Sequence, residues 1–294
     1  MILKVLLLGI IIINGLFAIN FIRDLVKNKD EFMKEKGNPI VMAISSFILF
    51  VLSTFGVSDF AVSTVLYRKM KLVDDKRLPG TLNTQCVLPV ATMALIYISA
   101  IEVDVTTLVV CILAQIIGAY IGPRFVVKMN VLSIKKFISA GLIVAAALIL
   151  AGKFGILASG GEATGLTGWK LVMLGVLSLL FGAFNNVGIG SYALTMATVY
   201  ALGLNPAVAF PIMMGACTFS VPVGSMQFIK LDSYSRKITF FTSTFGVLGV
   251  IIAAYVVKSL NVSVLQWIVV IVLLYSAYNM ISEMIKNKAV EEID

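Results

Sequence analysis

The sequence predicts an all-α, polytopic integral membrane protein, and its composition and its run lengths carry that prediction. Of its 294 residues, 60% are hydrophobic and only 13% are charged, whereas soluble domains hold about 45–50% apolar and about 25% charged residues. The apolar residues form continuous runs close to the ~20 residues that a membrane-crossing helix needs, and not the alternating segments of about ten residues that build a β-barrel. The soluble and disordered classes are therefore excluded.

Histidine and cysteine usage narrows the chemistry further. The sequence contains no histidine, which excludes imidazole metal sites, histidine-based catalytic triads and histidine proton relays. The three cysteines, Cys86, Cys111 and Cys217, lie far apart in apolar runs, without metal-ligand or disulfide spacing. The sequence also lacks the G-x-x-x-x-G-K-[ST] motif of ATP-driven pumps. We therefore expect no metal, no cofactor and no enzymatic activity.

Seven apolar runs have the length of a single crossing, and they lie near 2–21, 80–98, 105–123, 136–151, 207–229, 237–257 and 264–284. The first of them has the Lys4 of a signal peptide but lacks a small-x-small cleavage site, so we expect an uncleaved span. Two further stretches, 39–67 and 171–204, are too long for one crossing and too short for the roughly 40 residues that two crossings require.

The distribution of basic residues predicts the orientation, because cytoplasmic loops collect Lys and Arg. If each odd-length stretch dips into the membrane and returns to the same side, 19 of the 23 basic residues fall on one face, whereas single crossings would divide them almost evenly. The lengths favour re-entrant hairpins, although two tilted short crossings give the same count. We expect a plasma-membrane protein with its N-terminus outside and its C-terminus cytoplasmic. The net charge of +8 then reports orientation rather than nucleic-acid binding.

The two odd-length stretches resemble each other, since residues 56–62 align with residues 188–194 at an offset of 132. Each half then consists of a broken or re-entrant hairpin plus three spans. An odd number of crossings starts the second half on the opposite face, which is the inverted-topology repeat of many secondary transporters. The predicted organisation is an N-terminal span with a cytoplasmic linker, a first repeat, an extracytoplasmic linker, a second repeat and a cytoplasmic tail, at 1–38, 39–151, 152–170, 171–284 and 285–294.

Glycine and small polar residues interrupt both hairpins, and we expect the substrate site there. The first break holds Gly56 and Ser58, and the second holds Asn185, Asn186, Gly188, Gly190 and Ser191. Glycine lets the backbone leave helical geometry, and the short helix that follows begins with N–H groups of partial positive charge. Two such helix ends facing each other could replace the water shell of a carboxylate, a sulfonate or sulfite. Alternatively, the glycines only permit close helix packing, which Gly118-x-x-x-Gly122 also indicates.

Polar residues and prolines mark the span that follows each hairpin. Asn83 and Gln85 accompany Pro89 in the first half, and Pro211 and Pro222 interrupt the corresponding span of the second half. Asn83 and Gln85 either line the substrate site or form interhelical hydrogen bonds, which contribute about 0.6–2 kcal/mol each. Both are candidate substrate-binding residues.

Asp59 is the only charged residue between Val41 and Tyr67, and no Lys or Arg lies inside a predicted span to pair with it. A charged aspartate inside the membrane costs at least about 2.5–3.5 kcal/mol. Asp59 could cap the short helix, line a water-filled cavity, or bind a coupling H⁺ or Na⁺. Because an ionised carboxylate would repel an anionic substrate, ion coupling is the interpretation that we favour.

Residues 202–209 read Leu-Gly-Leu-Asn-Pro-Ala-Val-Ala, and they follow a glycine-rich break and a short helix. Together with the twofold repeat, this pattern resembles the sulfite exporter TauE/SafE family, also called the 4-toluene sulfonate uptake permeases. The resemblance covers about residues 39–284 and is carried by Gly188, Gly190 and Asn205-Pro206, whereas Ser58 and Asp59 stand where family members usually carry more glycine. It implies a secondary transporter of small, often sulfur-containing anions.

These features favour a secondary active transporter that moves sulfite, an organosulfonate or a similar small organic anion by alternating access. An anion channel is the alternative, since broken helices also line pores. An intramembrane enzyme is disfavoured, because Asp59 has neither a histidine nor a second membrane-embedded acid to work with. The expected partners are the small anion, the lipid bilayer and H⁺ or Na⁺, without nucleic acid, and the sequence leaves a homo-oligomer open.

Overall fold

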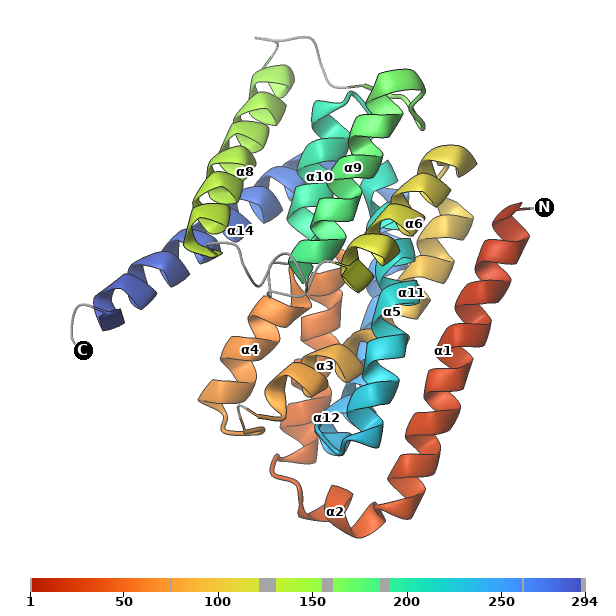
Figure 1. The fold of residues 1–294 in the computed structure, drawn as a ribbon, viewed down its shortest axis with the longest axis vertical. Helices are drawn as coiled ribbons and strands as arrows, with labels where there is room; N and C mark the ends of the chain where they lie inside the picture. Colours follow the sequence, from red (N-terminus) through yellow and green to blue (C-terminus); the bar gives the residue numbers. More distant parts are fainter. Residues whose placement is uncertain are drawn as a thin grey trace. The chain divides into compact units, whose positions relative to one another are not determined.

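A computed structural model describes residues 2–74, 76–121, 131–154, 161–185, 191–260 and 262–291. These ranges consist of helices and loops without a β-strand, which confirms the predicted all-α fold (Figure 1). The α-helices of the first half are α1 (Ile2–Lys27), α2 (Lys29–Lys34), α3 (Pro39–Thr54), α4 (Asp59–Lys69), α5 (Leu78–Ala100), α6 (Val105–Ile121) and α8 (Val131–Lys153). Those of the second half are α9 (Gly168–Asn185), α10 (Ser191–Ala201), α11 (Ala209–Lys230), α12 (Arg236–Phe241), α13 (Val247–Ser259) and α14 (Val262–Glu291). A 3₁₀-helix η1 (Pro206–Val208) precedes α11, and a π-helix η2 (Thr242–Gly246) joins α12 to α13.

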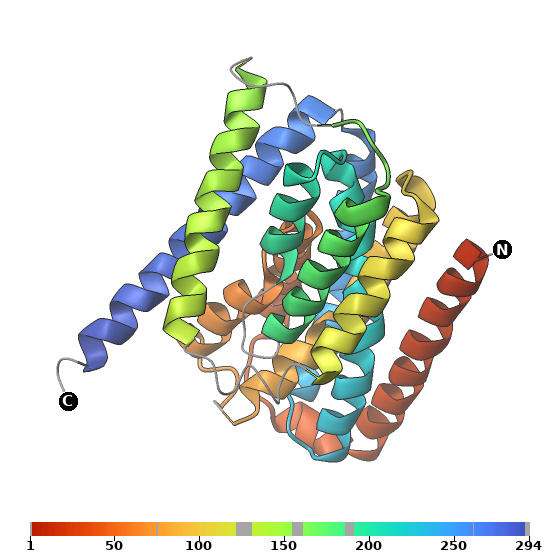
Figure 2. The same cartoon turned by 45° about the horizontal axis from the view of Figure 1, so that its top comes forward.

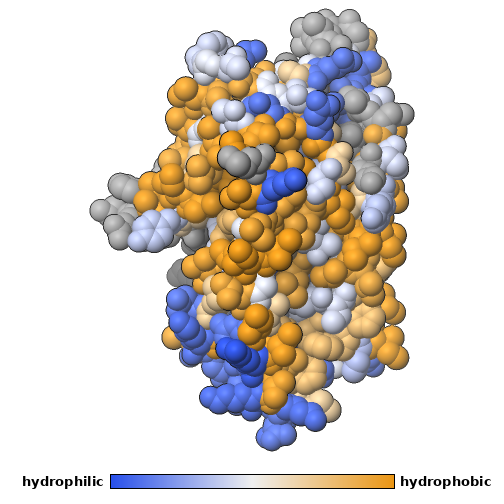
Figure 3. All heavy atoms as spheres, turned by 90° about the vertical axis from the view of Figure 1, so that its right-hand side faces the viewer, coloured by the Kyte–Doolittle hydropathy of each residue, from blue (hydrophilic) through white to orange (hydrophobic). Residues whose placement is uncertain are grey.

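Within these ranges, five helical segments are long and apolar enough to cross a membrane: Ile2–Lys27, Leu78–Ala100, Pro206–Lys230, Arg236–Val257 and Gln266–Ile285. Shorter apolar helical segments accompany them at Pro39–Thr54, Val105–Ile121, Ser139–Lys153 and Gly168–Phe184. Large apolar side chains such as Ile12, Ile44 and Val172 remain exposed, and a soluble protein rarely exposes contiguous surface of this kind. Figure 3 shows apolar atoms over much of the face that it draws, and its hydrophilic atoms include a group at the level where Figure 1 places α2. The chain is a polytopic α-helical membrane protein.

Both predicted hairpins contain an interrupted helix. The first comprises α3 and α4, which are 16 and 11 residues long and are separated by residues 55–58. At 1.5 Å per residue these helices extend about 24 and about 16 Å, so each is shorter than the roughly 30 Å of hydrocarbon in a bilayer. The second hairpin comprises α9 and α10, which are 18 and 11 residues long.

The helix bounds repeat along the chain within one residue of the 132-residue offset that the sequence alignment gives. The helix α4 begins at residue 59 and ends at residue 69, and α10 begins at 191 and ends at 201, which is 132 residues later at both ends. The helix α5 begins at residue 78 and α11 at residue 209, which is 131 residues later. In the same way α8 begins at residue 131 and α14 at residue 262. The two halves therefore build the same series of helices.

The compact units of the structure do not coincide with the two halves of the sequence. Unit 1 comprises Met1–Ile101 and Met214–Ser259, and unit 2 comprises Glu102–Met213 and Leu260–Asp294. In unit 1, α3 of the first half packs along η2 and α13 of the second half. In unit 2, α9 of the second half packs along α6 of the first half, and α8 packs along α14, as Figures 1 and 2 both show. Each unit thus contains one hairpin together with helices from the opposite half.

Glycines permit this packing, and they do so at matching positions. A Cβ atom on Gly118 of α6 would lie 1.9 Å from the Leu179 backbone oxygen of α9. A Cβ atom on Gly249 of α13 would lie 2.6 Å from the Phe47 backbone oxygen of α3. Phe47 and Leu179 are 132 residues apart, so the same position of each hairpin receives a glycine of the other half. Close packing at Gly118 is thereby confirmed, and Gly122 lies outside the described residues.

Two of the three prolines act as expected. Pro89 lies inside α5 and Pro222 inside α11, where each removes an intrahelical hydrogen bond. Pro211 lies near the start of the helical segment Pro206–Lys230, in the first turn of α11 directly after η1, where proline is better tolerated than in a helix interior.

Candidate functional site

The first break forms because its residues suit a turn followed by a new helix. Gly56 has a φ of +96°, a backbone conformation that only glycine adopts without strain. Ser58 is extended, and its hydroxyl accepts a hydrogen bond from the Ala61 backbone N–H at 3.3 Å. This is an N-cap, and it satisfies one of the donors that the start of a helix leaves open. The two predicted site residues therefore build the break and the start of α4.

Every buried residue of α4 carries a polar group. Its three buried residues are Asp59, Ser63 and Tyr67, which are spaced four residues apart and therefore lie on one face of the helix. Ser63 is fully buried, and Asp59 and Tyr67 are each 3% exposed. The ring of Tyr67 also belongs to a hydrophobic cluster. Buried polar groups in a membrane protein are costly unless they are paired or functional, so the partners of these three side chains matter.

Gln85 of α5 satisfies two of these three side chains. Its amide nitrogen donates to the Ser63 hydroxyl oxygen at 2.9 Å, and its Oε1 atom accepts a short hydrogen bond from the Tyr67 hydroxyl. Gln85 is itself fully buried. The predicted residue Gln85, on α5, therefore pairs with the buried polar side chains of α4. Ser63 and Tyr67 belong to the same site, and the sequence analysis did not identify them. Their signal was the four-residue spacing from Asp59.

The carboxyl group of Asp59 is the unsatisfied member of the site. Its Oδ2 atom is buried and has no hydrogen-bond partner among the described residues. None of the ion pairs in the described part of the chain includes Asp59. The carboxyl acts electrostatically on the Tyr67 hydroxyl and the Cys86 thiol, neither of which is a cation. The backbone N–H groups of Asp59 and Phe60 act on the carboxyl, but none of the described ion pairs supplies it with a compensating positive charge. A buried carboxylate without a counter-charge is unfavourable, which favours its neutralisation by a proton or by a bound cation.

Asn83 does not join this site. It is half-buried, and its side-chain amide donates to the Pro79 carbonyl of its own helix at 2.9 Å. Asn83 and Gln85 are two residues apart and so point to different sides of α5. The structure thus separates two residues that the sequence analysis treated alike.

Few of the second-hairpin residues can be placed. Asn186, Gly188 and Gly190 lie outside the described residues, and Asn185 is the last residue of α9. Ser191 is the first residue of α10 and is buried. By the 132-residue offset, Ser191 corresponds to Asp59 and Thr195 corresponds to Ser63. Both short helices therefore bury a polar pair at the same two positions.

Thr195 is a further residue that the sequence analysis missed. Its hydroxyl is buried and has no hydrogen-bond partner among the described residues. By contrast, the hydroxyls of Thr64 and Thr198 each donate to the carbonyl four residues earlier, at 2.7 and 2.8 Å. That local bond is the usual arrangement for a threonine inside a helix. Gln115 of α6, in the same unit, is also buried with both side-chain polar atoms unpartnered in the described structure.

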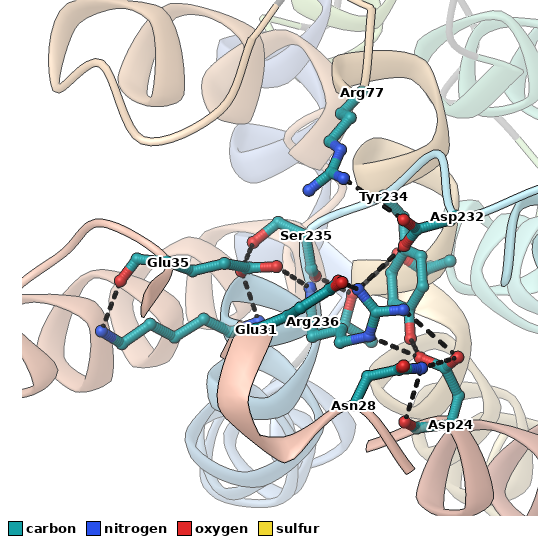
Figure 4. Close-up of polar contacts among 12 residues, drawn as sticks. Asp24, Asn28, Glu31, Glu35, Arg77, Asp232, Tyr234, Ser235 and Arg236 are labelled. Atoms are coloured by element: carbon teal, nitrogen blue, oxygen red, sulfur yellow. Dashed lines mark hydrogen bonds and ion pairs between the residues drawn. The ribbon is translucent and has the colours of Figure 1, made fainter. Parts of the chain in front are cut away.

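A charged cluster in unit 1 was not predicted at all (Figure 4). Arg236, at the start of α12, is only 2% exposed and is surrounded by carboxylates. Its Nε atom donates to Asp24 at 2.7 Å, and its Nη1 atom lies 2.9 Å from Glu31 and 2.8 Å from Asp232. The Tyr234 hydroxyl donates to Asp24 at 2.6 Å. Burial and the Asp24 carboxylate raise the pKa of Tyr234, so this hydroxyl remains a donor.

Glu35 completes the charged cluster by capping α12. Its carboxylate accepts the backbone N–H groups of Arg236 at 3.0 Å and of Lys237 at 2.8 Å, and the Ser235 hydroxyl at 2.6 Å (Figure 4). A carboxylate at a helix N-terminus is favourable because the N–H groups there carry partial positive charge. The cluster thus fastens the α1–α2 segment, which precedes the repeats, to a helix of the second half.

Comparisons of the chain with protein-family models, with curated proteins and with solved structures found no match. The resemblance of residues 202–209 and of the twofold repeat to the sulfite exporter family therefore stays a prediction. The broken hairpin and Asp59 are the features of the structure that bear on function.

Proposed function

We propose that the chain is a secondary active transporter that moves a small anion, such as sulfite, an organosulfonate or a similar small organic anion, by alternating access. The observation that carries the proposal is the buried carboxyl of Asp59, whose Oδ2 atom has no hydrogen-bond partner among the described residues, at the first turn of a helix that interrupts a membrane hairpin. Broken helices of this kind bind substrates and coupling ions in many secondary transporters. A side chain that must be neutralised in order to stay buried is suited to coupling, because its cation can travel with the substrate.

The two hairpins would divide the work. In the first hairpin, Asp59 already places a carboxyl at the start of α4, where an external anion would otherwise bind. In the second hairpin, the corresponding residue Ser191 leaves a neutral hydroxyl at the start of α10. The anion would therefore be held by the second hairpin, with Asn185, Asn186, Gly188, Gly190 and Ser191 as its candidate ligands, and the coupling H⁺ or Na⁺ by Asp59.

The proposed location is the plasma membrane, with the N-terminus outside and the C-terminus cytoplasmic. The distribution of Lys and Arg supports this orientation. Fusion of a reporter that fluoresces only in the cytoplasm to the C-terminus should give a signal, and the same reporter before residue 2 should give none. The opposite pattern would reverse the orientation.

The transport proposal is tested with purified protein in liposomes. Counterflow of radiolabelled sulfite, and separately of methanesulfonate, should be saturable and should require unlabelled anion inside. Asp59→Asn should keep exchange of the anion but lose its accumulation against a gradient, because the coupling group can no longer change charge. An ohmic anion current without exchange would indicate a channel instead, and neither current nor exchange with any anion would refute transport.

A further inference from the structure

Most oxygen atoms near the break of the first hairpin already take part in hydrogen bonds. In broken-helix transporters the carbonyls at the end of the interrupted helix bind Na⁺. At the end of α3 these carbonyls are in use. The Leu52 oxygen accepts the N–H groups of Phe55 and Val57, and the Ser53 oxygen accepts the N–H group of Gly56. The Thr54 oxygen accepts the Tyr97 hydroxyl of α5 at 2.8 Å.

Most side-chain hydroxyls around the break also take part in hydrogen bonds. The Ser58 hydroxyl caps α4, and the Thr54 hydroxyl donates to the Phe50 carbonyl at 2.6 Å. The hydroxyls of Ser63 and Tyr67 are bound to Gln85. Only the Ser53 hydroxyl and the Oδ2 atom of Asp59 remain without a partner among the described residues of the break. Hard cations in proteins are typically held by roughly six oxygens, so a metal ion here would have to share oxygens that already take part in hydrogen bonds, whereas a proton needs only the Asp59 carboxyl.

No described charged side chain neutralises Asp59 from the neighbouring helices. On α4 the facing titratable group is Tyr67, and on α5 the nearby groups are Cys86 and Tyr97, all of which are neutral. The helix α12 contributes the apolar residues Ile238 and Phe241 to the hydrophobic cluster that contains Tyr67. The cations of α12 are engaged elsewhere, Arg236 with Asp24 and Lys237 with Glu35.

The register of the two halves supports a neutral group at this position. The residue that corresponds to Asp59 in α10 is Ser191, a hydroxyl of similar polarity to a carboxylic acid and likewise buried. A protonated Asp59 therefore resembles its counterpart in the other half, whereas an ionised Asp59 does not.

We propose that the coupling ion is a proton, carried as the neutral carboxylic acid of Asp59. The O–H bond of the acid breaks when the site opens to water, which releases the proton and leaves a carboxylate, and rebinding of a proton permits the group to be buried again. This inference rests on the proposed transport function only in its claim that the proton is coupled to movement of the anion. Protonation itself can be measured without transport.

Infrared spectroscopy of the purified protein tests protonation directly. At neutral pH, in buffer that contains K⁺ and no Na⁺, the wild type should show the carbonyl stretch of a protonated carboxylic acid, shifted in D₂O. The band should be lost in Asp59→Asn and retained in the control Glu102→Gln, which removes an exposed carboxyl between α5 and α6. Absence of the band in the wild type, or its loss on addition of Na⁺, would overturn the proposal.

Transport gives the second arm. A pH gradient without Na⁺ should drive accumulation of sulfite or methanesulfonate by the wild type and by Glu102→Gln, and Asp59→Asn should only equilibrate the anion. Accumulation that requires Na⁺ would refute the proton while leaving the transporter in place. Conversely, an Asp59 band in a protein that exchanges no anion would refute the transporter, and proton coupling with it, while leaving the protonated carboxyl in place.

Discussion

Gln85 holds together the polar face of α4, and its environment distinguishes it from Asn83 on the same helix. Replacement of Gln85 by Leu would leave the buried hydroxyls of Ser63 and Tyr67 without their partner. We expect a loss of about 1–3 kcal/mol in the free energy of unfolding, since a buried polar group without a partner costs this much. The matched change Asn83→Leu breaks only a bond within its own helix and should stay within about 0.5 kcal/mol. Unfolding in detergent measures both, and equal losses would contradict the assignment of Gln85.

The buried side chain of Arg236 should contribute strongly to stability through its ion pair with Asp24. Arg236→Met would leave the mostly buried Asp24 without its cation, and we expect a loss of about 3 kcal/mol, typical of breaking a buried ion pair from one side. Adding Asp24→Asn to that variant should recover part of the loss. Arg77→Met is the matched control, because the Arg77–Asp232 pair is exposed at 39% and 49% and should contribute about 0–1 kcal/mol. Stability that does not respond to Arg236→Met would show that the charged cluster does not fasten α1–α2.

The position of Arg236 also shows what sequence reasoning could not reach. Arg236 immediately precedes the apolar run predicted at 237–257, and in the sequence its charge indicates only the orientation of that run in the membrane. Its partners Asp24 and Glu31 are more than 200 residues earlier in the chain. No local pattern links residues so far apart, whereas Asp59, Ser63 and Tyr67 share one helical face and could have been grouped by spacing alone.

At the scale of helices, the apolar runs predict the positions of the long helices, because the thickness of the membrane sets both the length of an apolar run and the length of a helix that crosses it. The run at 237–257 corresponds to α12, η2 and α13, and the run at 80–98 lies within α5. The π-helix η2 lies inside the run at 237–257, and the residues of that run do not predict it. It places Gly246 where an added Cβ would meet the Phe50 ring at 2.7 Å, and only the packed structure shows this constraint.

The contact between α6 and α9 gives a prediction for a pair of helices. Gly118→Ala should separate them, because the added Cβ would lie 1.9 Å from a backbone oxygen, and backbone cannot move aside as a flexible side chain can. We expect a loss of about 1–3 kcal/mol, the usual effect of overpacking. Gly141→Ala in α8 is the control, since nothing lies within 4 Å of its added Cβ, and alanine should stabilise that helix by about 0.5–1 kcal/mol. Thermal unfolding in detergent should therefore shift in opposite directions for the two variants.

At the scale of the whole molecule, each compact unit needs helices from both halves of the chain. Expressed separately, the fragments 1–160 and 161–294 should each be degraded, because α3 lacks α13 and α9 lacks α6. Expressed together, they should associate and copurify through a tag on one of them. The readout is the yield of membrane-inserted fragment with and without its partner. A first fragment that folds stably alone would contradict the reciprocal packing.

The reciprocal packing also has a consequence for the order of events during synthesis. The helix α3 ends at residue 54, but its partner α13 begins only at residue 247. At roughly 5–20 residues per second, the ribosome needs on the order of 10–40 s to make the intervening chain. During that interval Asp59 and the polar face of α4 have no complete unit to enter. The first hairpin of the nascent chain therefore stays without its packing partner, at the membrane surface or bound to the insertion machinery, until the second half of the chain has been synthesised.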